Sequence, residues 1–229
     1  MKRKAITIYH GSERIIEKPV YGAGNARNDY GLGFYCTESS DLAKEWACSS
    51  MHGGYANRYT LDLSGLKILD LTGKEYTILH WLTVLLENRY FSVKSRVSAI
   101  GKQYLIDHFS IDTSACDIIK GYRADDSYFA FAQDFLDNTI TVQKLSEAMK
   151  LGRLGVQIVL KSEASFGHLS FEGYETAEQS VYYPLRKQRD ELARSAYRKN
   201  VRNSELTEDD LFLADIIRGG LKADDPRIQ

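Results

Sequence analysis

Two short stretches of the chain combine glycines with residues that could hold a ligand. Gly31 and Gly33 flank Leu32, and this spacing lets a backbone turn tightly and approach a ligand without a Cβ in the way. These glycines precede a short apolar strand. A dinucleotide-binding fingerprint needs its glycines after a strand and at the start of a helix, with a third at a fixed offset. The stretch therefore predicts a ligand-binding turn and excludes a Rossmann site here.

The second stretch lies upstream, where the residues Y-H-G-S at positions 9–12 directly follow the apolar run of residues 5–8. This H-G-S, followed by G-x-G, a hydrophobic residue and Tyr35, resembles the ADP-ribosyltransferase superfamily. The branch is the one shared by diphtheria toxin and the poly(ADP-ribose) polymerases. In the polymerases a second ring that stacks on nicotinamide follows the tyrosine by eleven residues, and in this chain that position is Trp46.

The resemblance implies an NAD site. His10 would hold a ribose hydroxyl of NAD, Gly11 would hold the nicotinamide carboxamide through its backbone, and Tyr35 and Trp46 would sandwich the nicotinamide ring. Loss of nicotinamide leaves an oxocarbenium-like ribosyl centre, so a flat slot that fixes the ring would orient the bond to be broken. Singly, such residues are more often packing residues. The cofactor-binding residues implied by the resemblance are His10, Gly11, Ser12, Gly33, Tyr35 and Trp46.

The pattern departs from the family at Gln157, in the late strand V-Q-I-V-L. Most superfamily members carry a glutamate at this position, which bonds the ribose hydroxyl and assists attack by the acceptor. An amide can bond a hydroxyl but cannot act as a base or stabilise positive charge as a carboxylate does. Members of the polymerase group without the glutamate generally add a single ADP-ribose, so the resemblance implies single transfer, with His10, Tyr35 and Gln157 as the catalytic residues.

Four other carboxylates could replace the missing one: Asp125, Asp126, Glu163 and Glu172. An acidic pair after a strand is more often a helix cap than a catalytic group. Restoring the glutamate by Gln157→Glu is expected to keep or raise NAD cleavage, provided that no nearby acid in the pocket opposes it.

The elements that would position these residues follow from the periodicity of apolar side chains. Strands are predicted near residues 4–10, 34–37, 55–63, 66–71, 117–121, 156–161 and 166–174. Helices are predicted near residues 41–51, 74–88, 93–108, 127–138, 141–151, 186–200 and 205–217. Strands scattered between helices predict an α+β fold. The resemblance implies the ADP-ribosyltransferase fold, a split and mostly antiparallel sheet with helical insertions and a helical C-terminus.

The domain organisation follows from the same pattern. Residues 1–183 are expected to form one ADP-ribosyltransferase-like domain, with a helical insertion at about residues 74–110. Pro184 is expected to end the sheet region, because proline interrupts regular backbone hydrogen bonding. Residues 184–229 would then form a charged, helical C-terminal extension.

The helix predicted at residues 186–200 is charged on nearly every side, which is typical of a solvent-exposed helix. We expect it on the surface near the mouth of the site, available to a neutralising protein. A second helix, at residues 205–217, would be capped by Thr207 with Asp210 three residues later, a pattern close to a capping box.

The composition of the chain limits the binding partners and the cellular compartment that can be expected. The net charge of −1 gives no broad basic surface for nucleic acid or an anionic membrane. No apolar run approaches the ~20 residues of a membrane-spanning helix. Cys36, Cys48 and Cys116 lack metal-ligand spacing, and with no secretory segment after Met1 they fit a reducing interior. We expect a cytoplasmic protein with no metal and no membrane contact.

Nearly the whole chain resembles a bacterial family of ADP-ribosyltransferase-like proteins that are often encoded beside a small partner protein. The resemblance implies a toxin of a toxin–antitoxin pair, which moves one ADP-ribose from NAD to a macromolecule, protein or nucleic acid, with the small protein as antitoxin. Three alternatives remain: an NAD-binding module with weak or no chemistry, an interaction protein that works through its C-terminal helices, and an enzyme that uses NAD to remove a 2′-phosphate from RNA. No dense Arg and His phosphate clamp is visible for the last.

Overall fold

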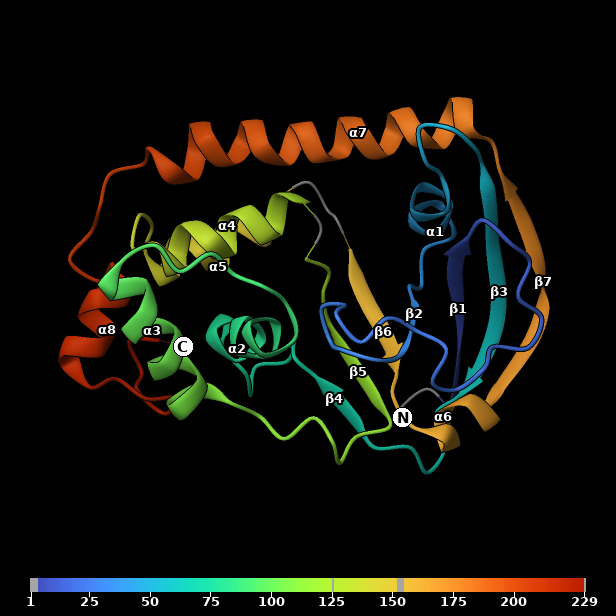
Figure 1. Cartoon of the computed structure of the whole chain (residues 1–229), viewed down its shortest axis with the longest axis horizontal. Coiled ribbons are helices and arrows are strands. Elements are labelled where there is room, and N and C mark those ends of the chain that lie inside the picture. The colour runs from blue at the N-terminus through green and yellow to red at the C-terminus, as the bar shows by residue number, and fades with distance from the viewer. Residues whose placement is uncertain (1–3, 125, 152–154, 229) are drawn as a thin grey trace.

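The structure, a computed structural model, describes residues 4–124, 126–151 and 155–228, and within them seven strands form two sheets (Figure 1). The first sheet has the order β1-β3-β7 and is antiparallel throughout. Its strands are β1 (Ala5–Ser12), β3 (Gly54–Asp62) and β7 (Leu169–Ala177).

The second sheet has the order β2-β6-β5-β4, and its pairs are antiparallel except for β4 with β5. Its strands are β2 (Phe34–Cys36), β4 (Ile68–Asp70), β5 (Ile118–Tyr122) and β6 (Val156–Leu160). A bridge between Tyr9 and Thr37 connects β1 to the end of β2. The two sheets therefore meet at the strands that carry His10 and Tyr35, and the α+β class with a mostly antiparallel split sheet is confirmed.

The strand β6 separates two hydrophobic cores. Val159 belongs to the larger core, which the helices cover, whereas Ile158 and Leu160 belong to the smaller core, to which both sheets contribute. A continuous apolar run suits a strand buried on both faces. Because side chains alternate along a strand, Gln157 shares a face with Val159 and lies on the side of the larger core.

Helices cover both ends of this arrangement. The helix α1 (Ser40–Ala47) packs on β1 and β3. The helices of the larger core are α2 (Ile78–Asn88), α3 (Arg96–Phe109), α4 (Asp126–Leu136), α5 (Val142–Ala148) and α8 (Leu213–Gly219). The long α7 (Gln179–Ala196) continues into a π-helical turn (Tyr197–Arg202) and lies across the molecule, in contact with α1 and α4 (Figure 1). No helix in the described part of the chain is long and apolar enough to cross a membrane.

Two predicted helices begin later than their patterns indicated. The one expected from residue 74 begins at Ile78, because the hydroxyl of Thr77 accepts the backbone N–H of Leu79 at 3.3 Å and so caps the helix there. Thr207 does pair with Asp210, whose carboxylate accepts the Thr207 N–H at 2.8 Å. That bond closes a turn, and the helix α8 starts only at residue 213.

The region after β6 departs further from the elements predicted from the sequence. Residues 163–167 form a short helix, α6 (Glu163–Gly167), so the last strand begins at residue 169 and not at 166. Pro184 does not end the sheet region, since β7 ends at Ala177 and α7 begins at residue 179. Proline is tolerated within α7 because it removes one hydrogen bond near the start of a long helix that packs on its neighbours. The boundary expected between residues 183 and 184 therefore falls inside α7.

Candidate functional site

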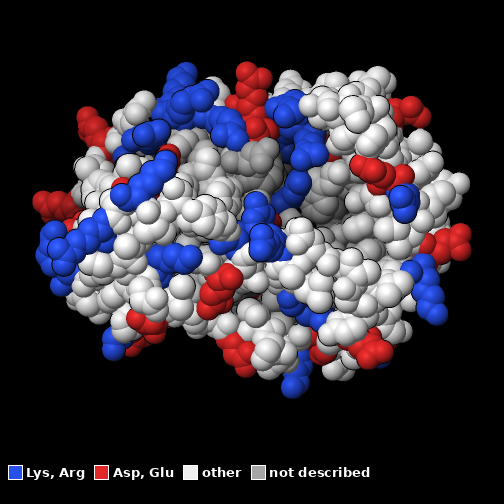
Figure 2. All heavy atoms as spheres, viewed as in Figure 1, with Lys and Arg blue, Asp and Glu red and all other residues white. Residues whose placement is uncertain are grey.

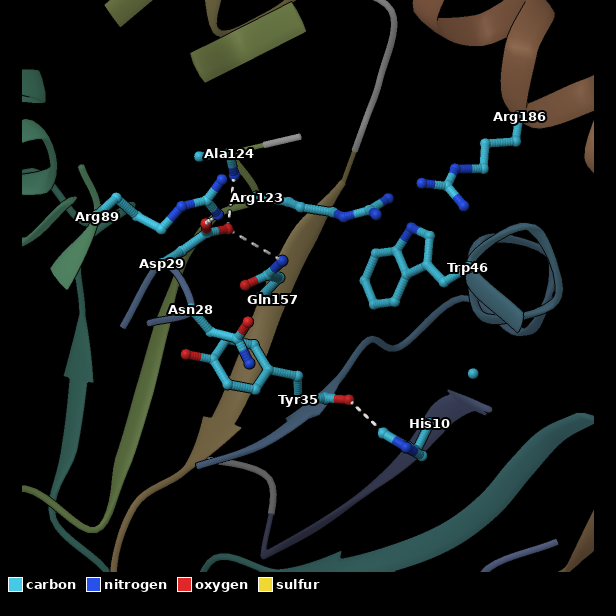
Figure 3. Close-up of a pocket in the computed structure, with 11 residues that line it drawn as sticks. His10, Asn28, Asp29, Tyr35, Trp46, Arg89, Arg123, Ala124, Gln157 and Arg186 are labelled. Carbon is cyan, nitrogen blue, oxygen red and sulfur yellow. Dashed lines mark hydrogen bonds and ion pairs between the residues drawn. The ribbon is translucent and has the colours of Figure 1, made fainter. Parts of the chain in front are cut away.

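A pocket of about 300 Å3 is open to solvent where the two sheets meet (Figure 3). The side chains that line it come from both sheets, from α1 and α7, and from the loops between elements. They are His10, Gly11, Asn28, Asp29, Tyr35, Trp46, Arg89, Arg123, Ala124, Gln157 and Arg186. The structure thus brings together five residues expected from the sequence, which lie up to 147 positions apart, counted from His10 to Gln157.

His10 is held in one orientation by β2. Its Nδ1 donates to the backbone oxygen of Tyr35 at 2.7 Å, and its ring stacks on Phe34 with ring centres 4.2 Å apart. Burial lowers the pKa of His10, so the ring is neutral at pH 7, although the bond to Tyr35 acts in the opposite direction. A neutral ring that donates through Nδ1 has an unprotonated Nε2, which can accept a hydrogen bond from a ligand hydroxyl.

Gly11 allows α1 to approach β1. A Cβ on Gly11 would lie 2.1 Å from the backbone oxygen of Ala43, so only glycine permits this close packing. The contact places Trp46, one turn along α1, at the pocket. Ser12, the third residue of the H-G-S, is not among the described lining residues, and its hydroxyl accepts the backbone N–H of Arg14 at 3.2 Å.

Tyr35 is fixed by the turn that precedes β2. Its hydroxyl donates to the Gly31 oxygen at 2.6 Å and accepts the Tyr30 N–H at 3.0 Å. Gly31 has φ of +72°, a conformation that favours glycine. Gly33 lines an adjoining pocket, and a Cβ there would lie 2.6 Å from Val159 Cγ1. The G-x-G pattern therefore serves the turn and its packing on β6, and it orients the tyrosine ring.

Trp46 lies across the pocket from Tyr35 and Gln157 in Figure 3, with the guanidinium group of Arg123 over its ring at 4.5 Å. The indole Nε1 is buried and has no hydrogen-bond partner among the described residues. A buried donor without a partner is costly, and sites of this kind are often completed by a ligand. Trp46 thus offers a ring face and a free donor.

Gln157 is the second residue of β6 and is paired with Gly121 of β5. Only 5% of its surface is exposed. Its Nε2 donates a long hydrogen bond to Asp29 Oδ2 at 3.5 Å, whereas its Oε1 is buried with no partner in the described part of the chain. The pocket therefore contains an unsatisfied acceptor as well as the unsatisfied donor of Trp46.

Asp29 is one of the lining residues that sequence reasoning missed. It is 5% exposed, and its carboxylate accepts from Arg89 Nη1 at 2.5 Å and from the Ala124 N–H at 2.9 Å. Burial raises the pKa of Asp29, while the Ala124 N–H and the guanidinium groups of Arg89 and Arg123 oppose the rise. The only sequence signal was its place directly before the glycine-rich turn, which does not reveal a buried ion pair.

Three arginines were also missed, although they line the described pocket. Arg89 follows α2, Arg123 follows β5 and Arg186 lies in α7. They are far apart in the chain, so no local cluster marked them. Figure 2 shows basic side chains grouped around the hollow in the middle of this face and over α7. A chain with a net charge of −1 thus presents a locally basic pocket.

Two of the four carboxylates named from the sequence lie away from the pocket, and the side chains of the other two are not among those described. Asp125 is not among the described residues, and Asp126 begins α4 with a side chain that is likewise not described. Glu163 lines a separate pocket beside Phe166, and Glu172 lies with Arg58 in another. Of the carboxylates in the described part of the chain, Asp29 is the one that lines the pocket with Gln157.

A second pocket, of about 380 Å3, adjoins the first and shares His10, Asn28 and Tyr35 with it. Its other lining residues are Ile16, Lys18, Pro19, Val20, Gly22, Ala23, Gly24, Gly33, Phe34 and Phe166. The loop between β1 and β2 therefore forms much of one side, as its irregular composition suggested. The lining of the first pocket is the more polar of the two, and that of the second is the more apolar.

A comparison with protein families matches residues 6–171 to the family described as "Protein of unknown function (DUF3990)". The matched range runs from β1 into β7 and contains every residue that lines the described pocket except Arg186. No curated protein and no solved structure matches the chain.

Proposed function

The chain belongs to the DUF3990 family, and we propose that it is an NAD-dependent mono-ADP-ribosyltransferase with the ADP-ribosyltransferase fold. The observation that carries this proposal is the convergence of His10, Gly11, Tyr35, Trp46 and Gln157 on one pocket. These are the residues to which the resemblance gives roles in NAD binding and catalysis.

The polar atoms of the pocket fit NAD as a substrate. His10 Nε2 can accept a hydrogen bond from a ribose hydroxyl, and two buried atoms that have no partner among the described residues, Gln157 Oε1 and Trp46 Nε1, would gain one from a bound ligand. The volumes of the two adjoining pockets, about 300 and 380 Å3, are in the usual range for small-molecule sites, roughly 300–1,000 Å3. An elongated dinucleotide would extend through both.

In this proposal the aromatic side chains fix the leaving group and Gln157 holds the ribose. The bond from nicotinamide to ribose C1′ breaks, nicotinamide leaves with the bonding electrons, and a nucleophile of the acceptor bonds to C1′ and releases its proton. The amide of Gln157 is not basic, so that proton goes to another group or to water. Gln157 therefore acts by accepting a hydrogen bond from the ribose hydroxyl, which orients the sugar.

The biological setting rests on the resemblance to bacterial ADP-ribosyltransferase-like toxins. We propose that the protein is the toxin of a toxin–antitoxin pair in the cytoplasm, that its acceptor is a macromolecule, protein or nucleic acid, and that a small protein encoded beside it is the antitoxin. The position of Arg186 supports the expectation that α7 lies near the mouth of the site, where a neutralising protein could cover it.

The proposal is tested first by ligand-dependent fluorescence. NAD or nicotinamide should quench Trp46, because its ring lines the pocket, and Trp46→Phe should abolish the change. The matched control is Trp81→Phe, since Trp81 is 1% exposed, donates to the Tyr122 oxygen at 3.1 Å and does not line the described pocket. Retention of the quenching in Trp46→Phe, with its loss in Trp81→Phe, would refute the role of Trp46.

Turnover is tested by incubating the protein with NAD and measuring released nicotinamide. A mass-spectrometric search for ADP-ribose adducts in cells that express the protein would identify the acceptor. Binding without nicotinamide release, with or without cell extract, would favour the alternative of an NAD-binding module that acts through protein contacts. The observation that favours this alternative is the amide at position 157, where most members of the superfamily that the chain resembles carry a carboxylate.

The three arginines of the described pocket favour one further candidate, the NAD-dependent removal of a 2′-phosphate from RNA. Arg89, Arg123 and Arg186 line the pocket together, although no clamp was visible in the sequence. Guanidinium groups bind phosphate oxygens well. An RNA oligonucleotide with an internal 2′-phosphate should stimulate nicotinamide release if this candidate holds, and the same oligonucleotide without the phosphate should not.

A further inference from the structure

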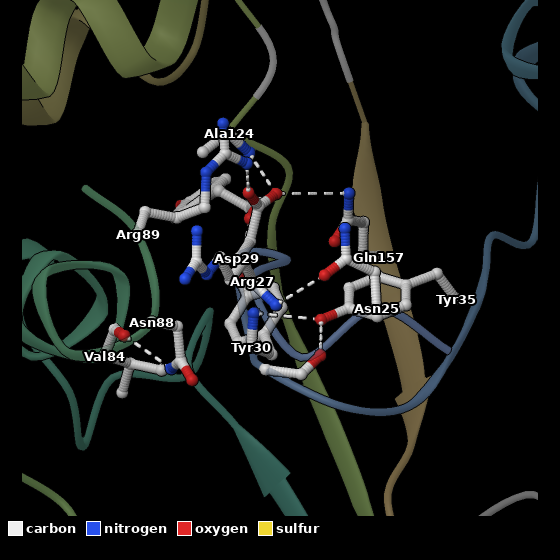
Figure 4. Close-up of polar contacts among 12 residues, drawn as sticks. Asn25, Arg27, Asp29, Tyr30, Tyr35, Val84, Asn88, Arg89, Ala124 and Gln157 are labelled. Carbon is white, nitrogen blue, oxygen red and sulfur yellow. Dashed lines mark hydrogen bonds and ion pairs between the residues drawn. The ribbon is translucent and has the colours of Figure 1, made fainter. Parts of the chain in front are cut away.

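The carboxylate of Asp29 lies beside the Gln157 amide, and both side chains line the pocket (Figure 4). Three donors point at it: Arg89 Nη1 at 2.5 Å, the Ala124 N–H at 2.9 Å and Gln157 Nε2 at 3.5 Å. These groups come from the end of α2, the segment after β5 and the start of β6. Asp29 therefore connects three elements that meet only in the folded protein.

This contact determines which end of the Gln157 amide faces the carboxylate. A carboxylate only accepts hydrogen bonds, so it favours the NH2 end of an amide and repels the oxygen end. With Nε2 held by Asp29, the Oε1 of Gln157 has no partner in the described part of the chain, and it belongs to a side chain that lines the pocket. The acceptor is thus buried and unsatisfied in the described part of the chain, and a hydroxyl of a bound ligand would satisfy it.

Arg89 keeps Asp29 charged and in place. Its guanidinium group lies over the ring of Phe129 at 5.1 Å and is bonded to Asp29, so the side chain is held from two directions. Buried carboxylates are stable in the charged form when donors surround them. Besides Arg89, the Ala124 N–H and the Gln157 amide, the described charged and polar groups near Asp29 include Arg123, Tyr30 and Tyr35.

We propose that Asp29 is a positioning residue for the reaction, in which its carboxylate holds the Gln157 amide with Oε1 turned into the pocket to accept a ribose hydroxyl. Asp29 and Gln157 together then take the place of the glutamate that most relatives carry: Gln157 supplies the contact and Asp29 the negative charge behind it. The assignment of the hydroxyl to NAD rests on the proposed function. The orientation of the amide rests on the contacts alone.

The arrangement reverses the expectation for Gln157→Glu. That substitution was expected to keep or raise NAD cleavage only if no acid lay nearby, and Asp29 is such an acid. Two carboxylates beside one arginine repel each other, and one of them is driven to take up a proton. The double variant Asp29→Asn/Gln157→Glu exchanges the two groups, and it keeps one amide, one carboxylate and the same net charge beside Arg89.

The test compares kcat and KM for nicotinamide release in wild type, Asp29→Asn, Gln157→Glu and the double variant. Each single variant should lose kcat on the order of tenfold or more, the scale of one hydrogen bond to a charged group, with a smaller change in KM. The double variant should exceed both singles. A double variant no better than the product of the two losses would overturn the proposal, as would wild-type kcat in Asp29→Asn.

The matched control is Glu45→Gln. Glu45 is also buried, at 2% exposure, and is paired with an arginine, Arg189, at 2.7 Å, but it does not line the described pocket. Its substitution also removes a buried carboxylate next to an arginine and should leave kcat within about twofold of wild type, because sites that share no partners act nearly independently. A loss in Glu45→Gln equal to that in Asp29→Asn would show that broken ion pairs act through general damage, which would overturn the positioning role.

A second measurement separates this inference from the proposed function. The side-chain amide protons of Gln157, observed by NMR in protein labelled with 15N-glutamine and assigned with Gln157→Ala, should exchange slowly in wild type and faster in Asp29→Asn. Unchanged exchange would overturn the positioning contact whatever the activity. Slow exchange that is lost in Asp29→Asn, in a protein that never cleaves NAD, would support the contact and reject the transferase.

Discussion

The side of the pocket that carries Trp46 and the side that carries Asp29 are held in place by different interactions. On the first, His10, Gly11 and Trp46 form an aromatic wall, in which a neutral ring is bonded to a backbone oxygen and α1 lies directly on the glycine. On the second, Asp29 and Gln157, with Arg89, form a polar wall built on a buried ion pair. Tyr35 lies between the two walls. In the described contacts its hydroxyl bonds to the backbone of the preceding turn and to neither Asp29 nor Arg89.

This difference suggests a division of work. Flat, neutral side chains can hold an aromatic ring without a large desolvation cost, whereas buried charges are costly and are retained where they orient or stabilise something. We therefore expect damage to the aromatic wall to weaken binding, and damage to the polar wall to slow turnover while binding persists. The four predictions that follow test this expectation, from the largest effect to the smallest.

The largest effect is expected from the polar wall. Gln157→Ala should lower kcat for NAD cleavage on the order of a hundredfold, as loss of a positioned transition-state hydrogen bond does. Nicotinamide-induced quenching of Trp46 should persist. The control is Gln133→Ala, because the Gln133 amide bonds only to Ser92 in the described contacts and does not line the pocket. If quenching and kcat fell together in Gln157→Ala, the division between the walls would be wrong.

The second prediction is that one added methyl group, in Gly11→Ala, disrupts the packing of the aromatic wall. Gly11→Ala places a Cβ 2.1 Å from the Ala43 oxygen, so β1 and α1 must separate. We expect a loss of about 1–3 kcal/mol in the free energy of unfolding, measured in urea, as overpacking in cores costs. The Trp46 response to ligand should also be lost. Gly167→Ala serves as the control, because nothing lies within 4 Å of its added Cβ; an equal loss there would remove the steric explanation.

A smaller effect is expected at the rim, where Arg186 reaches the pocket from α7. Arg186→Ala should raise the Kd for NAD about two- to fivefold, the scale of a partly exposed charge interaction, and the difference should shrink as salt increases. Its neighbour Lys187 is exposed and lies over the Tyr183 ring at 5.7 Å. Lys187→Ala should bind NAD like wild type. Equal weakening in both variants would point to general attraction and not to a contact in the pocket.

The smallest effect is the pH dependence of stability that His10 contributes. Burial holds its folded-state pKa below the unfolded value of about 6.5, so below that pH the unfolded chain binds more protons than the folded one. Stability should therefore fall as pH drops from 6.5 through the lowered pKa. His10→Gln should flatten this slope. His80, whose pKa burial also lowers, contributes a second slope that should remain in His10→Gln and disappear in His80→Gln. An unchanged slope in His10→Gln would show that its ring is not buried as described.

The residues of the aromatic wall could be named from the sequence because the resemblance rests on short local motifs, and the order of the elements because it depends on local patterns. His10 and Gly11 end a strand, and Tyr35 and Trp46 follow at short spacing in the next strand and helix, so their neighbourhood is encoded within about forty residues. The alternation of apolar residues gave the strands, and the scattered order of strands and helices gave the α+β class. Gln157 was located through the resemblance, which puts it at the glutamate position of the superfamily's late strand.

The polar wall was decided only by the tertiary structure. Asp29 lies in an irregular loop, where no periodicity indicates whether a side chain is buried. Its partners Arg89 and Ala124 follow other elements, 60 and 95 positions away, and become its neighbours only when α2 and β5 pack around the second sheet. The place of Pro184 was also decided by the tertiary structure, because the packing of α7 on its neighbours stabilises a helix that contains the proline. Local patterns determine which elements form, whereas the burial of a charge depends on which elements pack together around it.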